Sequence, residues 1–145
     1  MVFKINIADR KENGKTFHLD ADSDVLIGLK VGDTIEGKDI KSELEGYELT
    51  ITGASDKAGF PSLANVEGTA LKRVLLKYGR GMRERKPRGM RKRKTVRGNT
   101  ISPDIVQINL AVKKAGSKPL TEIFPDQCKK KEEAKQETQT AEATA

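Results

Sequence analysis

The chain is poor in the residue types that enzymatic and metal sites most often use. Its 145 residues include one cysteine, Cys128, one histidine, His18, and no tryptophan. A single cysteine excludes an intramolecular disulfide and a multi-cysteine zinc site, and a single histidine excludes a histidine-rich metal centre. Nothing in the sequence identifies a nucleophile that His18 would serve as a general base. We therefore expect no enzymatic activity, no metal site and no cofactor.

Long apolar stretches are also missing. No segment reaches the roughly 18 consecutive apolar residues of a transmembrane helix, and the first 15 residues lack the apolar region of a secretory signal. Apolar residues make up 35% of the chain and aromatic residues 4%, which suits one domain with a modest core. We expect a cytoplasmic protein with no membrane partner and no small-molecule substrate.

Positive charge is concentrated in one segment. The formal net charge is +7, yet residues 1–68 carry a net charge of −5 and residues 98–145 are neutral. Residues 72–97 contain 13 Lys/Arg and one acidic residue, Glu84. A solvated surface usually mixes both signs, whereas a cluster of one sign is the electrostatic signature of nucleic-acid binding. The sequence therefore predicts a polyanionic partner for this segment.

Residues 80–97 are predicted to form an extended or mobile loop. The stretch RGMRERK recurs eight residues later as RGMRKRK, although a biased composition can produce such a repeat by chance. A helix is disfavoured by roughly 1 kcal/mol at each of Gly81 and Gly89 and by about 3 kcal/mol at Pro87. Arginine binds phosphate bidentately, so we expect the loop to order on RNA. The candidate RNA-binding residues are Lys57, Arg80, Arg83, Arg85, Lys86, Arg88, Arg91, Lys92, Arg93, Lys94 and Arg97.

The absence of aromatic residues between 80 and 97 favours recognition of RNA shape and backbone over reading of single strands. If about half of the ten cations in this stretch contact phosphate, the slope of log affinity against log salt should be roughly −3.5 to −4.5. The loop 53–61 admits two interpretations. It is either a structural turn with Phe60 in the core, or a contact loop in which Lys57 touches phosphate and Phe60 meets RNA.

Short stretches with alternating apolar residues predict a mainly β fold. The predicted strands are 2–8, 15–19, 34–36, 48–52, 71–77 and 105–113. A short helix is expected over 25–29, capped by Asp22, Ser23 or Asp24, and 119–125 is expected to be an irregular closing segment with Leu120 and Phe124 among its apolar contacts. Strands at this spacing favour a small antiparallel β-barrel or sandwich, and a closed barrel would leave no unpaired edge.

The domain organisation follows from these patterns. We expect a small antiparallel β-barrel with one or two short helices over residues 1–125, which includes the basic RNA-binding segment 77–98. Residues 126–145 are expected to be a disordered tail, because 129–145 contain no Leu, Ile, Val or aromatic residue.

Two motifs resemble a known family. Residues 53–61 (GASDKAGFP) and 91–102 (RKRKTVRGNTIS) are similar to those of the S6e family of ribosomal proteins from the archaeal and eukaryotic small subunit. The resemblance covers about residues 1–125 and implies a small β-barrel docked on the small subunit, with the basic segment running into ribosomal RNA. Eukaryotic members continue into a basic helix with phosphorylated serines. The tail of this chain has no serine and its length resembles archaeal members.

We therefore expect a structural constituent of the small ribosomal subunit whose partners are ribosomal RNA and neighbouring ribosomal proteins. The alternative is a free nucleic-acid-binding protein, such as an RNA chaperone or a DNA-compacting factor.

Overall fold

The computed structural model describes residues 2–9, 14–116, 118–125 and 127. Within them lie seven strands: β1 (Val2–Ala8), β2 (Thr16–Asp22), β3 (Thr34–Glu36), β4 (Glu48–Asp56), β5 (Leu71–Leu76), β6 (Lys92–Arg97) and β7 (Ile105–Lys114). The helical elements are the 3-10 turns η1 (Asp24–Leu26), η2 (Gly37–Asp39) and η3 (Ser42–Leu44) and one α-helical turn, α1 (Leu120–Ile123). The expected mainly β class is confirmed. The expected disordered tail lies outside the described residues, apart from Gln127.

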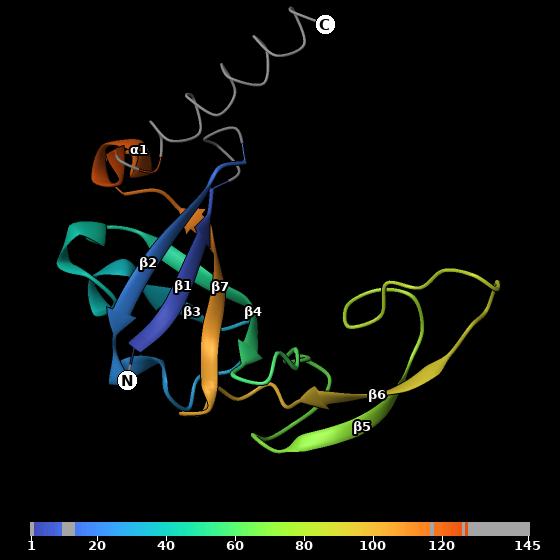
Figure 1. Cartoon of the computed structure of the whole chain (residues 1–145). Helices are drawn as coiled ribbons and strands as arrows, with labels where there is room; N and C mark the ends of the chain where they lie inside the picture. The colour runs from blue at the N-terminus through green and yellow to red at the C-terminus, as the bar shows by residue number, and fades with distance from the viewer. Residues whose placement is uncertain (1, 10–13, 117, 126, 128–145) are drawn as a thin grey trace, which may run out of the picture.

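Five strands form one curled sheet in the order β2-β1-β7-β4-β3 (Figure 1). The pairing is antiparallel except between β1 and β7, which run parallel with Ile5 opposite Ile108. Parallel neighbours need a long crossover connection, and here that connection contains most of the chain. The sheet is a half-barrel, since its outer strands β2 and β3 do not pair with each other in the described residues.

Alternation along the strands builds the core. Phe3, Ile5 and Ile7 point inward from β1 and are fully buried, as the sequence predicts. Ile108 and Leu110 on β7 point to the same side and are almost completely buried. Each such side chain removed from water contributes about 1.5–3 kcal/mol, so this inner face is the main source of the sheet's stability.

The helical turn α1 and the end of the described chain cover part of the core. Leu120 on α1 is fully buried, and the Phe124 ring stacks on Phe17 of β2 with centroids 5.8 Å apart. Gln127 accepts a hydrogen bond from His18 N–H at 2.8 Å and donates one to the His18 carbonyl at 2.5 Å. These bonds satisfy outer backbone groups of the edge strand β2. Gln127, which lies outside the expected domain 1–125, therefore contacts β2.

The strands β5 and β6 form a separate two-stranded ribbon. We name residues 71–97 the arm; it consists of β5, β6 and the loop 77–91 between them. Figure 1 shows the arm projecting away from the five-stranded sheet. The prediction of a loop over the whole of 80–97 is therefore wrong for 92–97, which pair with β5 along their full length.

Two further local predictions are corrected. The helix expected over 25–29 is reduced to the 3-10 turn η1, and no side-chain cap hydrogen bond forms at Ser23. Backbone groups of the segment after η1 bond the chain near Ile101 instead, as in Gly28 N–H to the Ile101 carbonyl at 3.0 Å and Ile101 N–H to the Leu29 carbonyl at 2.8 Å. The segment 119–125, expected to be irregular, contains the helical turn α1.

Candidate nucleic-acid interface

The arm presents the positive charge of residues 72–97 to solvent. Lys94 is half-buried, while most of the other candidate side chains on the arm are exposed. The exposed candidates are Arg80, Arg83, Arg85, Lys86, Arg88, Arg91, Lys92 and Arg93. Because the arm projects from the sheet (Figure 1), an anionic polymer can reach these side chains without first contacting the rest of the described chain. We name that remainder the body; its residues 1–68 carry a net charge of −5.

The strand β5 and the loop residue that follows it add exposed cations that the candidate set omits. Lys72, Arg73 and Lys77 are all exposed. The register places Lys72 opposite Val96 and Arg73 opposite Thr95, so these cations continue the charged surface along the ribbon. The charge count over residues 72–97 already included these three cations. On the arm the candidate set starts at Arg80, although the predicted basic segment 77–98 already includes Lys77.

The first turn of the basic loop is built onto the body. Gly79 and Met82 exchange two backbone hydrogen bonds of 2.8 and 3.0 Å, and the Met82 side chain is fully buried. Arg80 Nη1 donates a hydrogen bond of 2.8 Å to the Thr52 carbonyl on β4. This part of the loop is therefore a closed turn rather than an extended chain, and one nitrogen of Arg80 is already engaged.

Two side-chain pairs connect the loop with residues near its two ends. Glu84 pairs with Lys92, whose hydrogen bond and positive charge hold the pKa of Glu84 below its ordinary value. Glu84 therefore remains an anion and neutralises part of the charge at Lys92. The Arg85 guanidinium lies over the Tyr78 ring, 4.4 Å from its centroid, which is a cation–π contact.

Tyr78 is a residue that the sequence reasoning missed. It lies two positions before the stretch 80–97 in which aromatic residues are absent, and it is 53% exposed. An exposed ring covered by a guanidinium offers two flat groups on which a nucleobase can stack. The signal was present in the sequence, since Tyr78 directly follows Lys77 within the cationic segment.

Lys57 lies on the body, in the loop that follows β4. It is exposed, and its Nζ is 3.5 Å from Asp104 Oδ1. Asp56 Oδ1 accepts the N–H groups of Ala58 at 2.7 Å and Phe60 at 3.2 Å. These bonds and the half-buried Phe60 support the structural interpretation of this loop. Phosphate binding by Lys57 stays a prediction.

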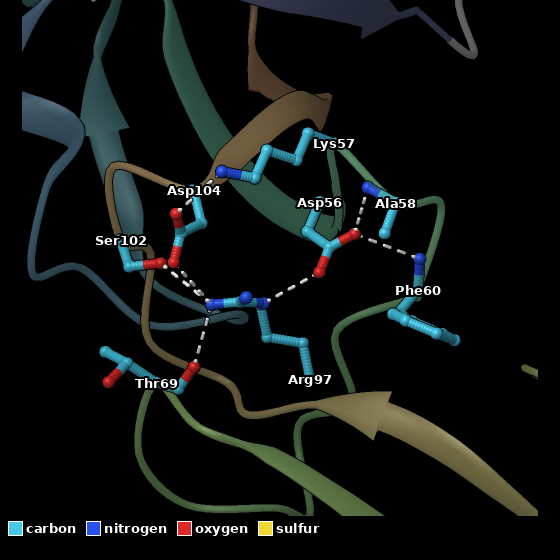
Figure 2. Close-up of polar contacts among 8 residues, drawn as sticks. All are labelled: Asp56, Lys57, Ala58, Phe60, Thr69, Arg97, Ser102 and Asp104. Carbon is cyan, nitrogen blue, oxygen red and sulfur yellow. Dashed lines mark hydrogen bonds and ion pairs between the residues drawn. The ribbon is translucent and has the colours of Figure 1, made fainter.

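Arg97 differs from the other candidates because it is buried. Its side chain is 11% exposed, and Figure 2 shows its guanidinium enclosed by polar groups of the protein. Nε–H donates to Asp56 Oδ2 at 3.1 Å, while Nη1 donates to the Thr69 carbonyl at 3.0 Å and to Ser102 Oγ and Asp104 Oδ2 at 3.3 Å each. The structure therefore places Arg97 among internal partners, and we remove it from the set of proposed phosphate contacts.

Two other features are absent from the part of the chain that the structure describes. No group of three or more His, Cys, Asp or Glu side chains there is placed to hold a metal ion. No helix there is long and apolar enough to span a membrane.

Comparison with known proteins identifies the family. The family model described as ribosomal protein S6e matches residues 3–125. The chain belongs to the S6e family of ribosomal proteins. The match confirms the resemblance drawn from residues 53–61 and 91–102, and S6e is a ribosomal family rather than an enzyme family.

Archaeal relatives cover most of this S6e chain. It is 48% identical over 120 residues to a protein of Methanococcus maripaludis (strain C5), and the aligned residues span 83% of this chain and 94% of the relative. It is 44% identical over 121 residues to one from Methanocaldococcus jannaschii, covering 83% and 89%. It is 45% identical over 136 residues to one from Archaeoglobus fulgidus, covering 92% and 100%. Each relative is named small ribosomal subunit protein eS6.

Proposed function

We propose that this protein is a structural constituent of the small ribosomal subunit and that its arm binds ribosomal RNA. Membership of the S6e family and the names of the relatives support the first part. The second part is supported by the exposed cations of the arm. The half-barrel is then the scaffold of residues 1–125. The protein resides on cytoplasmic ribosomes, beside RNA and neighbouring ribosomal proteins.

The observation that carries RNA binding is the separation of charge between the arm and the body. Residues 72–97 contain 13 Lys/Arg, whereas residues 1–68 carry a net charge of −5. Glu84 is the one acidic residue in 72–97, and Lys92 neutralises it. Arginine forms two parallel hydrogen bonds with phosphate, which a lysine ammonium cannot do. A duplex or folded RNA therefore has its strongest attraction to the arm.

Sedimentation tests the ribosomal role against the alternative of a free nucleic-acid-binding protein. The tagged full-length chain is expressed in Methanococcus maripaludis, and the lysate is run on sucrose gradients at low and raised salt, with and without ribonuclease. We expect co-migration with small subunits that survives moderate salt and is lost after ribonuclease treatment. A chain that spreads over all nucleic acid and is stripped by modest salt would instead be a general polyanion binder.

A matched pair of variants tests the arm. The first variant replaces Arg83, Arg88 and Arg91 with Gln. These three arm residues are exposed, and their side chains make no hydrogen bond or ion pair within the part of the chain that the structure describes. The control replaces three exposed body residues, Lys4, Lys30 and Lys113, with Gln and so changes the net charge equally. If all three arm residues contact phosphate, the arm variant should flatten the log–log salt slope by roughly 2 to 3, while the control retains it. Equal loss in both variants would refute binding by the arm.

A further inference from the structure

The buried Arg97 guanidinium joins the arm to the body. Arg97 is the last residue of β6, and Asp56, to which its Nε–H donates, is the last residue of β4. The Asp56 side chain is 2% exposed. A carboxylate and a guanidinium that are buried together and hydrogen-bonded hold a fixed relative position, because separating them leaves an unpaired buried charge.

The second side of the guanidinium reaches two more segments. Nη1 donates to the Thr69 carbonyl, which precedes β5, and to Ser102 and Asp104, which precede β7 (Figure 2). One side chain therefore connects both ends of the arm with the two strands of the sheet nearest to it. Backbone bonds add to this junction, from Arg97 N–H to the Pro61 carbonyl at 3.0 Å and from Leu63 N–H to the Arg97 carbonyl at 3.1 Å.

We propose that Asp56 and Arg97 form a clamp that fixes the direction in which the arm leaves the sheet, and so positions the arm's cations for RNA. This inference rests on the proposed function of the arm. The two strands of the arm pair with each other and not with the five-stranded sheet, so their direction is set where the arm meets the sheet, at this junction and at the Arg80 bond to the Thr52 carbonyl. An arm held in its bound direction loses less conformational freedom on binding, which raises affinity without adding a contact. Asp56 and Arg97 are thus positioning residues.

Replacement of Asp56 by Asn removes the clamp bond but keeps the bonds with which Asp56 also supports the loop after β4. The Asn amide oxygen can still accept the N–H groups of Ala58 and Phe60, as Asp56 Oδ1 does. The amide NH₂ group then stands where Oδ2 accepted the Arg97 Nε–H, and two donors face each other. The variant also makes the protein one unit more positive. Electrostatics alone therefore predicts tighter RNA binding, whereas the clamp predicts weaker binding.

The experiment measures affinity of the full chain for a transcript of small-subunit ribosomal RNA from Methanococcus maripaludis over a series of salt concentrations. The matched control is Glu67→Gln, which removes an exposed carboxylate just before the arm. We expect Asp56→Asn to bind about fivefold more weakly with an unchanged salt slope. Glu67→Gln should bind equally or up to about twofold more tightly. Circular dichroism at the assay temperature establishes that each variant is folded.

Arg97→Lys is the second variant. It keeps the positive charge, so a direct phosphate contact by Arg97 would be largely retained. A single ammonium cannot bond Asp56 and Ser102 from opposite sides, so the clamp predicts weaker binding here too. Spin labels at Lys4→Cys on β1 and Leu75→Cys on β5, in a Cys128→Ser background, report arm direction. The distance distribution between them should broaden in both clamp variants.

The outcomes separate the clamp from the function on which it rests. Asp56→Asn binding as tightly as Glu67→Gln, or Arg97→Lys binding like wild type, overturns the clamp. A label distance as narrow as in wild type does the same. A wild-type chain that binds the transcript no better than the Arg83, Arg88 and Arg91 triple variant overturns RNA binding by the arm instead.

Discussion

Gly98→Ala should destabilise the protein strongly, because Gly98 lies where two backbone segments cross. It directly follows β6 and is buried. A Cβ atom at this position would lie 1.8 Å from the Gly68 carbonyl oxygen and 2.5 Å from the Gly68 carbonyl carbon. Both atoms belong to the backbone, so no side-chain rotation can relieve the contact.

The size of the effect follows from the movement that is needed. Ordinary van der Waals contact begins at 3.4 Å, so the two segments must separate by roughly 1.6 Å. That movement breaks the bonds from Gly98 N–H to the Ala70 carbonyl and from Thr100 N–H to the Gly68 carbonyl, both 3.2 Å long. Each broken bond costs about 1 kcal/mol, and more where a buried group stays unpaired. We expect a loss of about 2–4 kcal/mol in the free energy of unfolding.

Gly53→Ala is the matched control for this measurement. The nearest atom to a Cβ at Gly53 is Arg80 Nη1 at 3.8 Å, an ordinary contact. This variant should be neutral or slightly more stable, since alanine restricts the unfolded chain. Thermal unfolding followed by circular dichroism should show a Tm for Gly98→Ala lower by of order 10 °C. Equal Tm values for the two variants would refute the crossing geometry on which the reasoning depends.

Two further predictions concern the arm. Met82→Ala empties a fully buried site that lies outside the main core cluster. Amide hydrogen exchange should therefore accelerate in β5 and the turn 79–82 but not in β1 or β7, and uniform acceleration would contradict a local role of Met82. The second prediction is a titration by NMR of the Glu84 carboxyl, whose pKa is lowered by the hydrogen bond and charge of Lys92. Because this pKa is depressed, the pair stabilises the arm at pH values above the ordinary pKa of Glu. That stabilisation is lost as the pH falls through the lowered pKa. Lys92→Ala should move the midpoint upward, and an unmoved midpoint would exclude the pair in solution.

The sequence predicts those strands whose pattern is local. The alternation of Phe3 and Ile5 with polar residues fixes β1 without reference to any partner, and the strand 34–36 was predicted with the bounds that β3 has. The partners of these strands could not be predicted, because pairing is a property of distant segments. The parallel pair of β1 and β7 joins the two ends of the domain, and no local pattern encodes it.

The elements that failed were decided by tertiary contacts. The apolar run at 25–29 is compatible with a helix, but its backbone groups bond the segment near Ile101. Four of the six residues of β6 are cationic, which hides any apolar alternation. Its strand character comes from its register with β5, where Leu75 lies opposite Arg93.

The candidate interface shows the same division. Charge adds along the chain, so counting Lys and Arg was enough to find the arm. Burial depends on distant segments and cannot be counted along the chain, so in the sequence Arg97 cannot be told from the other arginines of the segment. Its partner Asp56 lies 41 positions away, and the sequence gives no sign that the two side chains meet. The same residue type therefore has two roles, which exposure alone distinguishes.

These two roles depend on each other. The acidic body is repelled by a phosphate backbone over a screening length of about 10 Å at 0.1 M salt, so the cations are most effective on an arm that projects from it, as Figure 1 shows. A projecting two-stranded ribbon is marginally stable alone and gains its direction from its base. Among the arginines that the structure describes, Arg97 is the one withdrawn from solvent, and it lies at that base. If the arm binds RNA as proposed, the loss of one cation from its surface is offset by the fixed presentation of the others.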